Sequence, residues 1–246
     1  MRTANDTQAS AERARPPRRR RRTAEVARRE ILDATRDVLR DRGGAELSVE
    51  TLMAAAGMKR PNFYHYFGDL TDVLMCLLDE AQDELLASAT GYITGTSLGP
   101  QGLADAIRAS SETWARHRDI LLAVHDGTGD PRIAERYRAV TSEWANVTAA
   151  RLRAERRAGR TNVKRPDAVA SALTLMNINV FAERLGRGRE SPALVASVLI
   201  QIWIGAIYPD AEIDRRGRER TRGTVPSARR VRAAPTTVVT NPHDAA

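Results

Sequence analysis

The sequence predicts an all-α fold with about nine helices, because of three observations. Apolar residues recur at helical spacing through most of the stretch from Thr23 to Tyr208, as Ala27, Ile31 and Ala34 do in its first part. No part of this stretch shows the sustained alternation of apolar and polar residues that is typical of strands. Glycines and prolines separate the periodic segments, so we expect a succession of distinct helices.

The predicted helices begin and end at residues with suitable local chemistry. The first covers about Ala24–Arg40 and ends where Gly43 and Gly44 supply the backbone geometry of a helix C-terminus. The second begins at Ser48, a good N-cap, and ends at Gly57. The third covers Lys59–Phe67 and has a proline in its first turn, where the missing N–H has no helical partner in any case.

The fourth predicted helix, about Leu70–Ala89, follows a capping aspartate at position 69 and precedes a loop at 91–102. Two of the later helices begin at a proline beside an acidic residue, Asp130-Pro131 and Pro166-Asp167. The remaining helices are predicted at about 103–117, 119–124, 131–158, 166–185 and 192–208.

Charge divides the chain into a near-neutral body and two basic ends. The chain has 246 residues and a net charge of +8, with ten Arg against three acidic residues in 1–29 and eight against five in 209–246. Apolar residues make up 42% of the chain, enough for a buried core. We expect an Arg-rich disordered arm at 1–23, two folded domains at 24–84 and 85–208, and a disordered basic tail at 209–246.

Residues 48–67 have the pattern of a helix-turn-helix, in which the second helix enters the major groove of DNA. Phe63 and Phe67 stand four apart and are expected to face inward. Arg and Lys bind guanine edges, Asn binds adenine, and a Tyr hydroxyl usually holds phosphate. Polar donors of this kind gather near the start of the second helix: Lys59, Arg60, Asn62, Tyr64 and His65. The alternative is an ordinary corner between two helices with a polar outer face.

The stretch from Ile31 to Leu78 resembles the DNA-binding domain of TetR-family transcriptional regulators, through ILDATRDVLRDRG, LSVETLMAAAGMKRPNFYHYF and the DVL of the fourth helix. The resemblance implies a homodimeric repressor that binds a palindromic operator in double-stranded DNA and carries a C-terminal ligand-binding region. The chain departs from the family at Lys59, where a Ser or Thr cap is usual, and at Leu70, where a phosphate-binding Lys is frequent. The run Arg18–Arg22 is expected to replace that phosphate contact. A merely solvated charged tail is the alternative. The candidate DNA-binding residues are Arg20, Arg21, Arg22, Ser48, Lys59, Arg60, Asn62, Tyr64 and His65.

Residues 144–208 are similar to the actinobacterial branch of that family that represses the ethionamide-activating monooxygenase, through WANVTAARLRAERRAG, ALTLMN and IQIWIGAIY. The similarity implies a mostly apolar channel for a hydrophobic small-molecule effector, with Asn177 offering the polar hydrogen bond. The residues implied to line it are Trp114, Trp144, Thr174, Asn177 and Trp203. The alternative is that these Trp residues fill the core.

The segment 192–208 contains no charged residue, and it is too short for a membrane span of about 20 apolar residues. A helix that is apolar on nearly all sides is buried on nearly all sides. We therefore expect a homodimer in which 166–185 and 192–208 of each subunit form a four-helix bundle, and no membrane partner.

Other chemistry is not supported by the sequence. One cysteine, Cys76, and four scattered His residues provide neither a disulfide framework nor a metal site. Residues 95–99 fit the G-x-S-x-G hydrolase motif around Ser97, but no strand is predicted before them. Gly127-Thr128-Gly129 lacks such a strand too, so we expect no cofactor and no enzyme.

The sequence therefore predicts a cytoplasmic, ligand-responsive DNA-binding repressor. The absence of an apolar signal core in the first ten residues supports the cytoplasmic location. The alternatives are a DNA-binding protein without sequence specificity and a helical hydrolase that uses Ser97.

Overall fold

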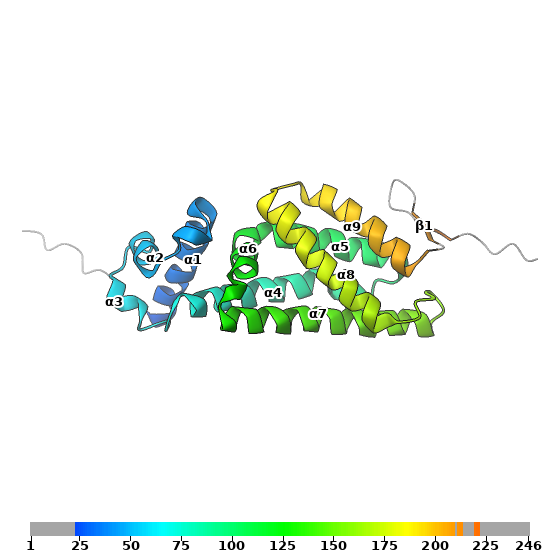
Figure 1. The fold of residues 1–246 in the computed structure, drawn as a ribbon, viewed down its shortest axis with the longest axis horizontal. Helices are drawn as coiled ribbons and strands as arrows, with labels where there is room; N and C mark the ends of the chain where they lie inside the picture. Colours follow the sequence, from blue (N-terminus) through cyan, green and yellow to red (C-terminus); the bar gives the residue numbers. More distant parts are fainter. Residues whose placement is uncertain (1–22, 210, 214–218, 222–246) are drawn as a thin grey trace, which may run out of the picture.

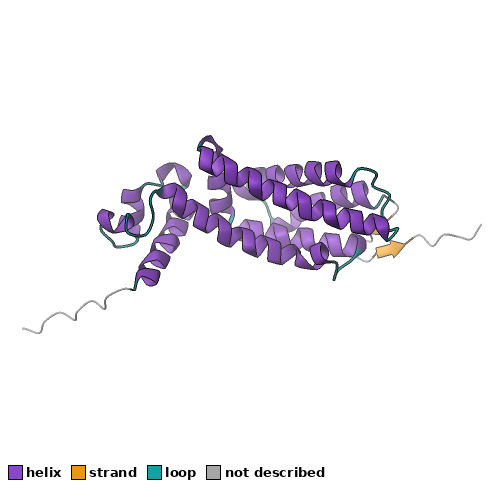
Figure 2. Ribbon diagram, turned by 90° about the horizontal axis from the view of Figure 1, so that it is seen from below, coloured by secondary structure: helices purple, strands orange, loops and turns teal. Residues whose placement is uncertain are grey.

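A computed structural model describes residues 23–209, 211–213 and 219–221, and these form an elongated helical molecule (Figures 1 and 2). The described residues contain nine α-helices, as the sequence predicts. Their bounds are α1 Ala24–Arg42, α2 Val49–Ala55, α3 Arg60–Phe63, α4 Leu70–Thr94, α5 Gly99–Arg116, α6 Arg118–Asp126, α7 Pro131–Arg157, α8 Pro166–Val180 and α9 Pro192–Ile207. Two short strands, β1 Ala211–Ile213 and β2 Glu219–Thr221, pair in antiparallel orientation.

Helices α1–α3 form a head at one end of the molecule, and α4–α9 form a longer bundle beside it (Figure 1). Within the bundle α4 packs against α5 and α7, α7 packs against α8, and α5 packs against α9. Helix α4 belongs to both parts, because its first turns pack on the head and its later turns pack in the bundle. This continuous helix therefore joins the two parts, and α6 of the bundle also packs against α1 of the head.

The local chemistry at the predicted helix starts is confirmed. The side chain of Ser48 accepts a hydrogen bond from the Thr51 N–H at 3.1 Å, and that of Asp69 accepts one from the Asp72 N–H at 2.9 Å. Asp130 caps α7 by accepting from the Arg132 N–H at 2.8 Å. These bonds satisfy backbone donors that have no partner inside a helix.

Several boundaries differ from the prediction. Helix α5 begins at Gly99, inside the predicted loop, rather than at 103. Helix α3 ends at Phe63, and Tyr64 to Tyr66 continue as a turn. Helix α4 continues into the predicted loop as far as Thr94, because the buried Tyr92 is held there by a hydrogen bond of 3.1 Å between its hydroxyl and that of Tyr208. The α-helical part of α8 ends at Val180, and the chain continues as a π-helical segment over Phe181–Arg187.

Residues 1–22, which contain the predicted Arg-rich arm with Arg20, Arg21 and Arg22, lie outside the described residues. Most of the predicted basic tail lies outside them as well. Strands β1 and β2 fall within that tail and were not predicted, because segments of three residues are too short to show a periodic pattern.

Candidate nucleic-acid interface and interior cavity

The head exposes its polar donors, whereas two phenylalanines are buried: Phe63 at the end of α3 and Phe67 just after the turn that follows it. Phe63 is 0% exposed and Phe67 is 5% exposed, and their ring centroids lie 5.8 Å apart. Tyr64 stands next to Phe63 in sequence but is 55% exposed. The remaining predicted contacts are also exposed: Lys59, Arg60, Asn62 and His65. Five of the predicted DNA-binding residues are thus exposed on the head.

Ser48 has a different local role from these five residues. It is half-buried, and its hydroxyl caps α2 and lies 2.7 Å from the hydroxyl of Thr51. Lys59 stands at the N-cap of α3 without a side-chain capping bond, so its ammonium group is not tied to the helix that it precedes. Sequence reasoning missed Arg28 of α1, whose guanidinium lies over the Phe67 ring at 5.0 Å and adds positive charge beside the outward donors.

Ion pairs fasten the start of α4 to the start of α7. Arg132 donates to Asp69 at 2.7 Å and also to Asp72. The hydrogen bond from Arg132 holds the pKa of Asp72 below its usual value. The Thr71 hydroxyl donates to Asp130 at 3.1 Å, so both capping residues take part in the junction. The end of α4 that adjoins the head is therefore also tied to the first turn of α7.

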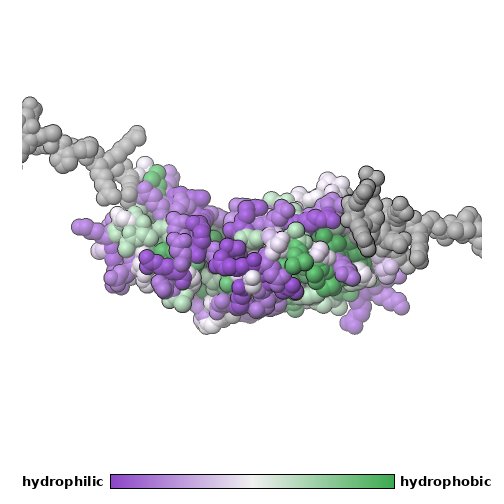
Figure 3. Space-filling view, turned by 90° about the horizontal axis from the view of Figure 1, so that it is seen from above, coloured by the Kyte–Doolittle hydropathy of each residue, from purple (hydrophilic) through white to green (hydrophobic). Residues whose placement is uncertain are grey.

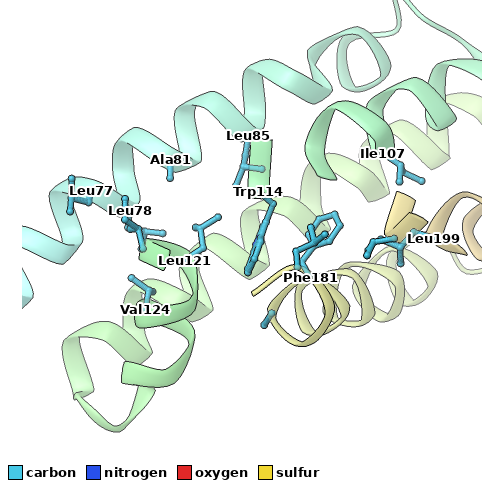
Figure 4. Packing of buried hydrophobic residues seen from close by; sticks show 14 of the residues in the cluster. Leu77, Leu78, Ala81, Leu85, Ile107, Trp114, Leu121, Val124, Phe181 and Leu199 are labelled. Carbon is cyan, nitrogen blue, oxygen red and sulfur yellow. The ribbon is translucent and has the colours of Figure 1, made fainter. Parts of the chain in front are cut away.

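The bundle contains a partly open cavity of about 110 Å³ between α4, α5, α6, α7 and α8. Most of its surface is apolar, with contributions from Leu78, Leu85, Leu121, Val124 and Phe181. Figure 4 shows Trp114 beside Phe181 and facing Leu85 and Leu121 of the surrounding helices. The ring centroids of Trp114 and Phe181 lie 5.9 Å apart. A concave, mostly apolar space with a few polar groups is the usual form of a small-molecule site.

The structure brings three of the five predicted ligand-binding residues to this cavity. Trp114, Trp144 and Asn177 line it. Thr174 and Trp203 do not; both are buried, and Trp203 instead donates from its indole Nε1 to Asn177 Oδ1 at 3.2 Å. Trp203 therefore acts on the cavity through Asn177.

Sequence reasoning missed several polar residues of the lining. They come from four different helices: Gln82, Ser110, His125, Tyr137 and Thr141. Each lies in a periodic helical segment like those that form the rest of the core, so the sequence has no signal that distinguishes a cavity-lining position from a packed one.

Comparisons with known proteins agree with this arrangement of head and bundle. Residues 31–74 match the family model for bacterial regulatory proteins of the tetR family, and residues 103–209 match the model for the C-terminal domain of the transcriptional regulator EthR. The HTH-type transcriptional regulator EthR of Mycobacterium tuberculosis is 31% identical over 184 residues, which cover 72% of this chain and 85% of the relative. The chain belongs to the TetR family of transcriptional regulators.

This TetR-family regulator has further relatives of the same kind. The HTH-type transcriptional regulator EthR of Mycolicibacterium smegmatis is 28% identical over 190 residues, covering 72% of this chain and 84% of the relative. The crystal structure of a TetR-like transcriptional regulator from Rhodococcus sp. RHA1 superposes with a TM-score of 0.58 at 20% identity, over 78% of this chain and 98% of that one. These similarities confirm the family and the fold that the sequence predicts.

The TetR-family regulator exposes an apolar face on α8 and α9. Leu194, Val198 and Ile202 stand four residues apart on α9 and are 52%, 38% and 42% exposed, and Leu175 of α8 is 45% exposed. Helix α9 contains no charged residue, and α8 contains only Asp167. Figure 3 shows hydrophobic residues gathered on the bundle, away from the head. An exposed apolar surface of this kind marks a contact with another molecule.

The hydrolase-like motif around Ser97 and the glycine motif at 127–129 do not form sites in the described structure. Ser97 lies in the connection between α4 and α5, so a helix precedes it where the hydrolase motif requires a strand. Gly127–Gly129 form a short 3₁₀ turn between α6 and α7. In the part of the chain that the structure describes, no cluster of His, Cys, Asp and Glu could hold a metal ion. None of the described helices is both long and apolar enough to cross a membrane.

Proposed function

We propose that this regulator is a cytoplasmic homodimeric repressor that binds a palindromic operator and releases it when a small apolar ligand enters the bundle cavity. The observation that carries the proposal is the head surface on which Lys59, Arg60, Asn62, Tyr64 and His65 are all exposed above the buried Phe63 and Phe67. Its direct connection through α4 to a bundle with an interior cavity supports control of the head by a ligand.

In the proposed complex the outward residues read and hold the major groove. Lys59, Arg60 and Asn62 have the donors that base edges accept, and the Tyr64 hydroxyl and His65 suit phosphate oxygens. Ser48, at the start of α2, holds the preceding helix in place and lies close enough to the surface to approach phosphate. Two such heads related by a two-fold axis would contact half-sites about 34 Å apart, one turn of DNA.

The basic arm adds a contact without base specificity. Arg20, Arg21 and Arg22 immediately precede the first described residue, so the arm leaves the protein at the head. Each phosphate that the arm neutralises releases counterions and steepens the dependence of affinity on salt. Deleting residues 1–22 should flatten the slope of log affinity against log salt concentration; an identical slope would show that the arm takes no part.

The partner for the exposed face of α8 and α9 is a second copy of the chain. A two-fold interface presents the same patch from both subunits, and an uncharged apolar patch is compatible with itself. Packing 166–185 and 192–208 of each subunit together gives a four-helix bundle and removes Leu175, Leu194, Val198 and Ile202 from water.

Ligand binding is coupled to the head through the size of the cavity. Small-molecule sites usually measure about 300–1,000 Å³, and this cavity measures only about 110 Å³. A ligand of ordinary size therefore has to separate the helices that line the cavity, among them α4. Because α4 supports the head, the ligand favours an arrangement of the two heads that no longer matches the operator spacing. A ligand with equal affinity for both arrangements would not release DNA.

The test is selection of bound fragments from a random DNA pool by the full-length protein, together with its mass in solution. We expect a palindromic motif and a dimer. A DNA-binding protein without sequence specificity would instead recover no motif and would lose its fragments to scrambled competitor DNA. A monomer that enriches no motif would overturn the proposal.

A further inference from the structure

Gln82 places a buried amide in the lining of the cavity. Its residue is 4% exposed, and it lies on α4 between Leu78 and Leu85, which also line the cavity. Its Nε2 is buried and has no hydrogen-bond partner in the described structure. Buried donors are normally paired, so an unpaired one in the wall of a cavity indicates a partner that belongs inside.

The orientation of this amide is fixed by Trp144. The indole Nε1 of Trp144 can only donate, and it lies 3.1 Å from Gln82 Oε1. Turning the amide over would place two donors against each other, so the oxygen has to face Trp144. The free group of Gln82 is therefore a donor, and only an acceptor can satisfy it.

Three other polar groups of the lining are engaged within the protein. Asn177 Oδ1 accepts from Trp203 at 3.2 Å, and the Thr141 hydroxyl donates to the carbonyl of Tyr137 at 2.8 Å. Ser110 lies 3.2 Å from the Ser88 hydroxyl. The residues that line the cavity include no Lys and no Arg, so a bound anion would lack a fixed positive charge there.

We infer that the ligand is an uncharged, mainly apolar molecule that presents an acceptor oxygen, such as the carbonyl of a ketone, ester or amide, to Gln82 Nε2. This inference rests on the cavity being the ligand site of the proposed repressor. Gln82 lies on α4, so the hydrogen bond attaches the ligand directly to the helix that supports the head. Gln82 therefore gives the cavity a buried donor that favours a ligand with an acceptor oxygen.

The experiment compares two probes of nearly equal shape, acetophenone and isopropylbenzene, in which the ketone oxygen replaces a methyl group. Their affinities for the full-length protein are measured by quenching of the fluorescence of Trp114 and Trp144, which line the cavity. The protein should prefer acetophenone, and Gln82→Met should reduce the ratio of the two affinities about tenfold. Gln101→Met, the same substitution on α5 at a residue that does not line the cavity, is the matched control and should retain the ratio.

A second measurement needs no variant and covers the case in which Gln82→Met does not fold. The chain contains four Gln residues, so selective ¹⁵N labelling of Gln side chains gives few resonances. Acetophenone should shift the Gln82 side-chain amide protons in the wild-type protein, and isopropylbenzene should leave them near their free positions.

The outcomes separate this inference from the proposed function. If both probes bind with a ratio of affinities that Gln82→Met does not alter, the inference is wrong and the cavity remains the ligand site. A water molecule that already accepts from Gln82 Nε2 would give this result. If neither probe binds, the inference fails together with the cavity as ligand site. Operator binding is then still decided by the DNA selection.

Discussion

The head and the bundle use their aromatic residues in opposite ways. In the head, Tyr64 is 55% exposed on an outer surface, above a filled core that contains Phe63. In the bundle, Trp114 is 6% exposed and faces an interior space that the surrounding helices do not fill. The residues that we assign to DNA binding lie on the surface of the head, whereas the residues that we assign to ligand binding lie beside a cavity inside the bundle.

The two regions also differ in the charged groups that they bury. In the bundle, the end of α7 carries Glu155, which is 0% exposed and accepts from Arg160 at 2.7 Å and from Arg151. Around α3 of the head, the residues in the core are Phe63, Phe67, Leu52 and Met53, all apolar. The stability of the bundle therefore depends on pH through groups that have no counterpart in the core around α3.

The largest effect should come from the core of the head. Replacing Phe63 by Ala removes a fully buried ring and leaves a cavity, which should lower the free energy of unfolding by about 4 kcal/mol. Thermal and chemical unfolding followed by circular dichroism measure this. An unchanged free energy of unfolding would mean that the stability of the head does not depend on Phe63. It would contradict the distinction between a buried Phe63 that stabilises the fold and an exposed Tyr64 that does not.

The buried ion pair of the bundle should have a slightly smaller effect. Glu155→Gln leaves Arg151 buried without its counter-charge and should lower the free energy of unfolding by about 3 kcal/mol near neutral pH. Asp167→Asn, which removes the exposed partner of Arg153, is the matched control and should change it by less than about 0.5 kcal/mol. Equal losses for the two variants would contradict a special role of burial.

The same residue gives the bundle a pH dependence at acidic pH. Burial raises the pKa of Glu155, but the hydrogen bond from Arg160 and the charge of Arg151 outweigh it and hold the pKa below the usual 4.5. The ionised form therefore stabilises the fold above that pH, and the stabilisation is lost as the pH falls through the lower folded-state pKa. In an acid titration of stability, Glu155→Gln should show a shallower decline than the wild type.

Tyr92 makes the stability of the bundle depend on pH at alkaline pH as well. Burial raises its pKa to about 12. The neutral phenol stabilises the fold below its usual pKa of 10, and this contribution is lost as the pH rises toward 12. Tyr92→Phe should weaken this alkaline dependence.

On the head surface, Tyr64→Ala should weaken operator binding by about 2 kcal/mol while leaving stability nearly unchanged. Tyr64→Phe separates the hydroxyl from the ring, because it retains any contact that the ring makes. Gel-shift titrations with the selected operator measure both variants. Wild-type affinity for Tyr64→Ala would remove this residue from the interface and leave the other four exposed donors to be tested.

The smallest effect on binding should come from Trp203, which does not line the cavity but contacts it through Asn177. Trp203→Phe loses the hydrogen bond to Asn177 and should weaken acetophenone binding by about 1 kcal/mol, with operator binding of the ligand-free protein unchanged. Calorimetry with the probe and gel shifts without it separate the two readouts. Loss of cooperative unfolding in this variant would instead assign Trp203 a core-filling role.

The sequence was sufficient for the helices and for the outward residues of the head, because both depend on local spacing. Phe63 and Phe67 stand four residues apart, about one helical turn, so the sequence predicts that both are buried on one side; Tyr64 and His65 between them are exposed. The helix caps at Ser48, Asp69 and Asp130 are hydrogen bonds to backbone N–H groups within three residues, so the local sequence is enough to predict them.

The cavity was only partly predictable, and tertiary packing decided the rest. Five helices surround it, and whether a buried side chain touches another residue or an empty space depends on how the five meet. Trp203 and Thr174 are as buried as Trp114, but their helices turn them away from the cavity, while Gln82 of α4 enters it. Helical periodicity distinguishes inside from outside, but it does not tell where the inside is left unfilled.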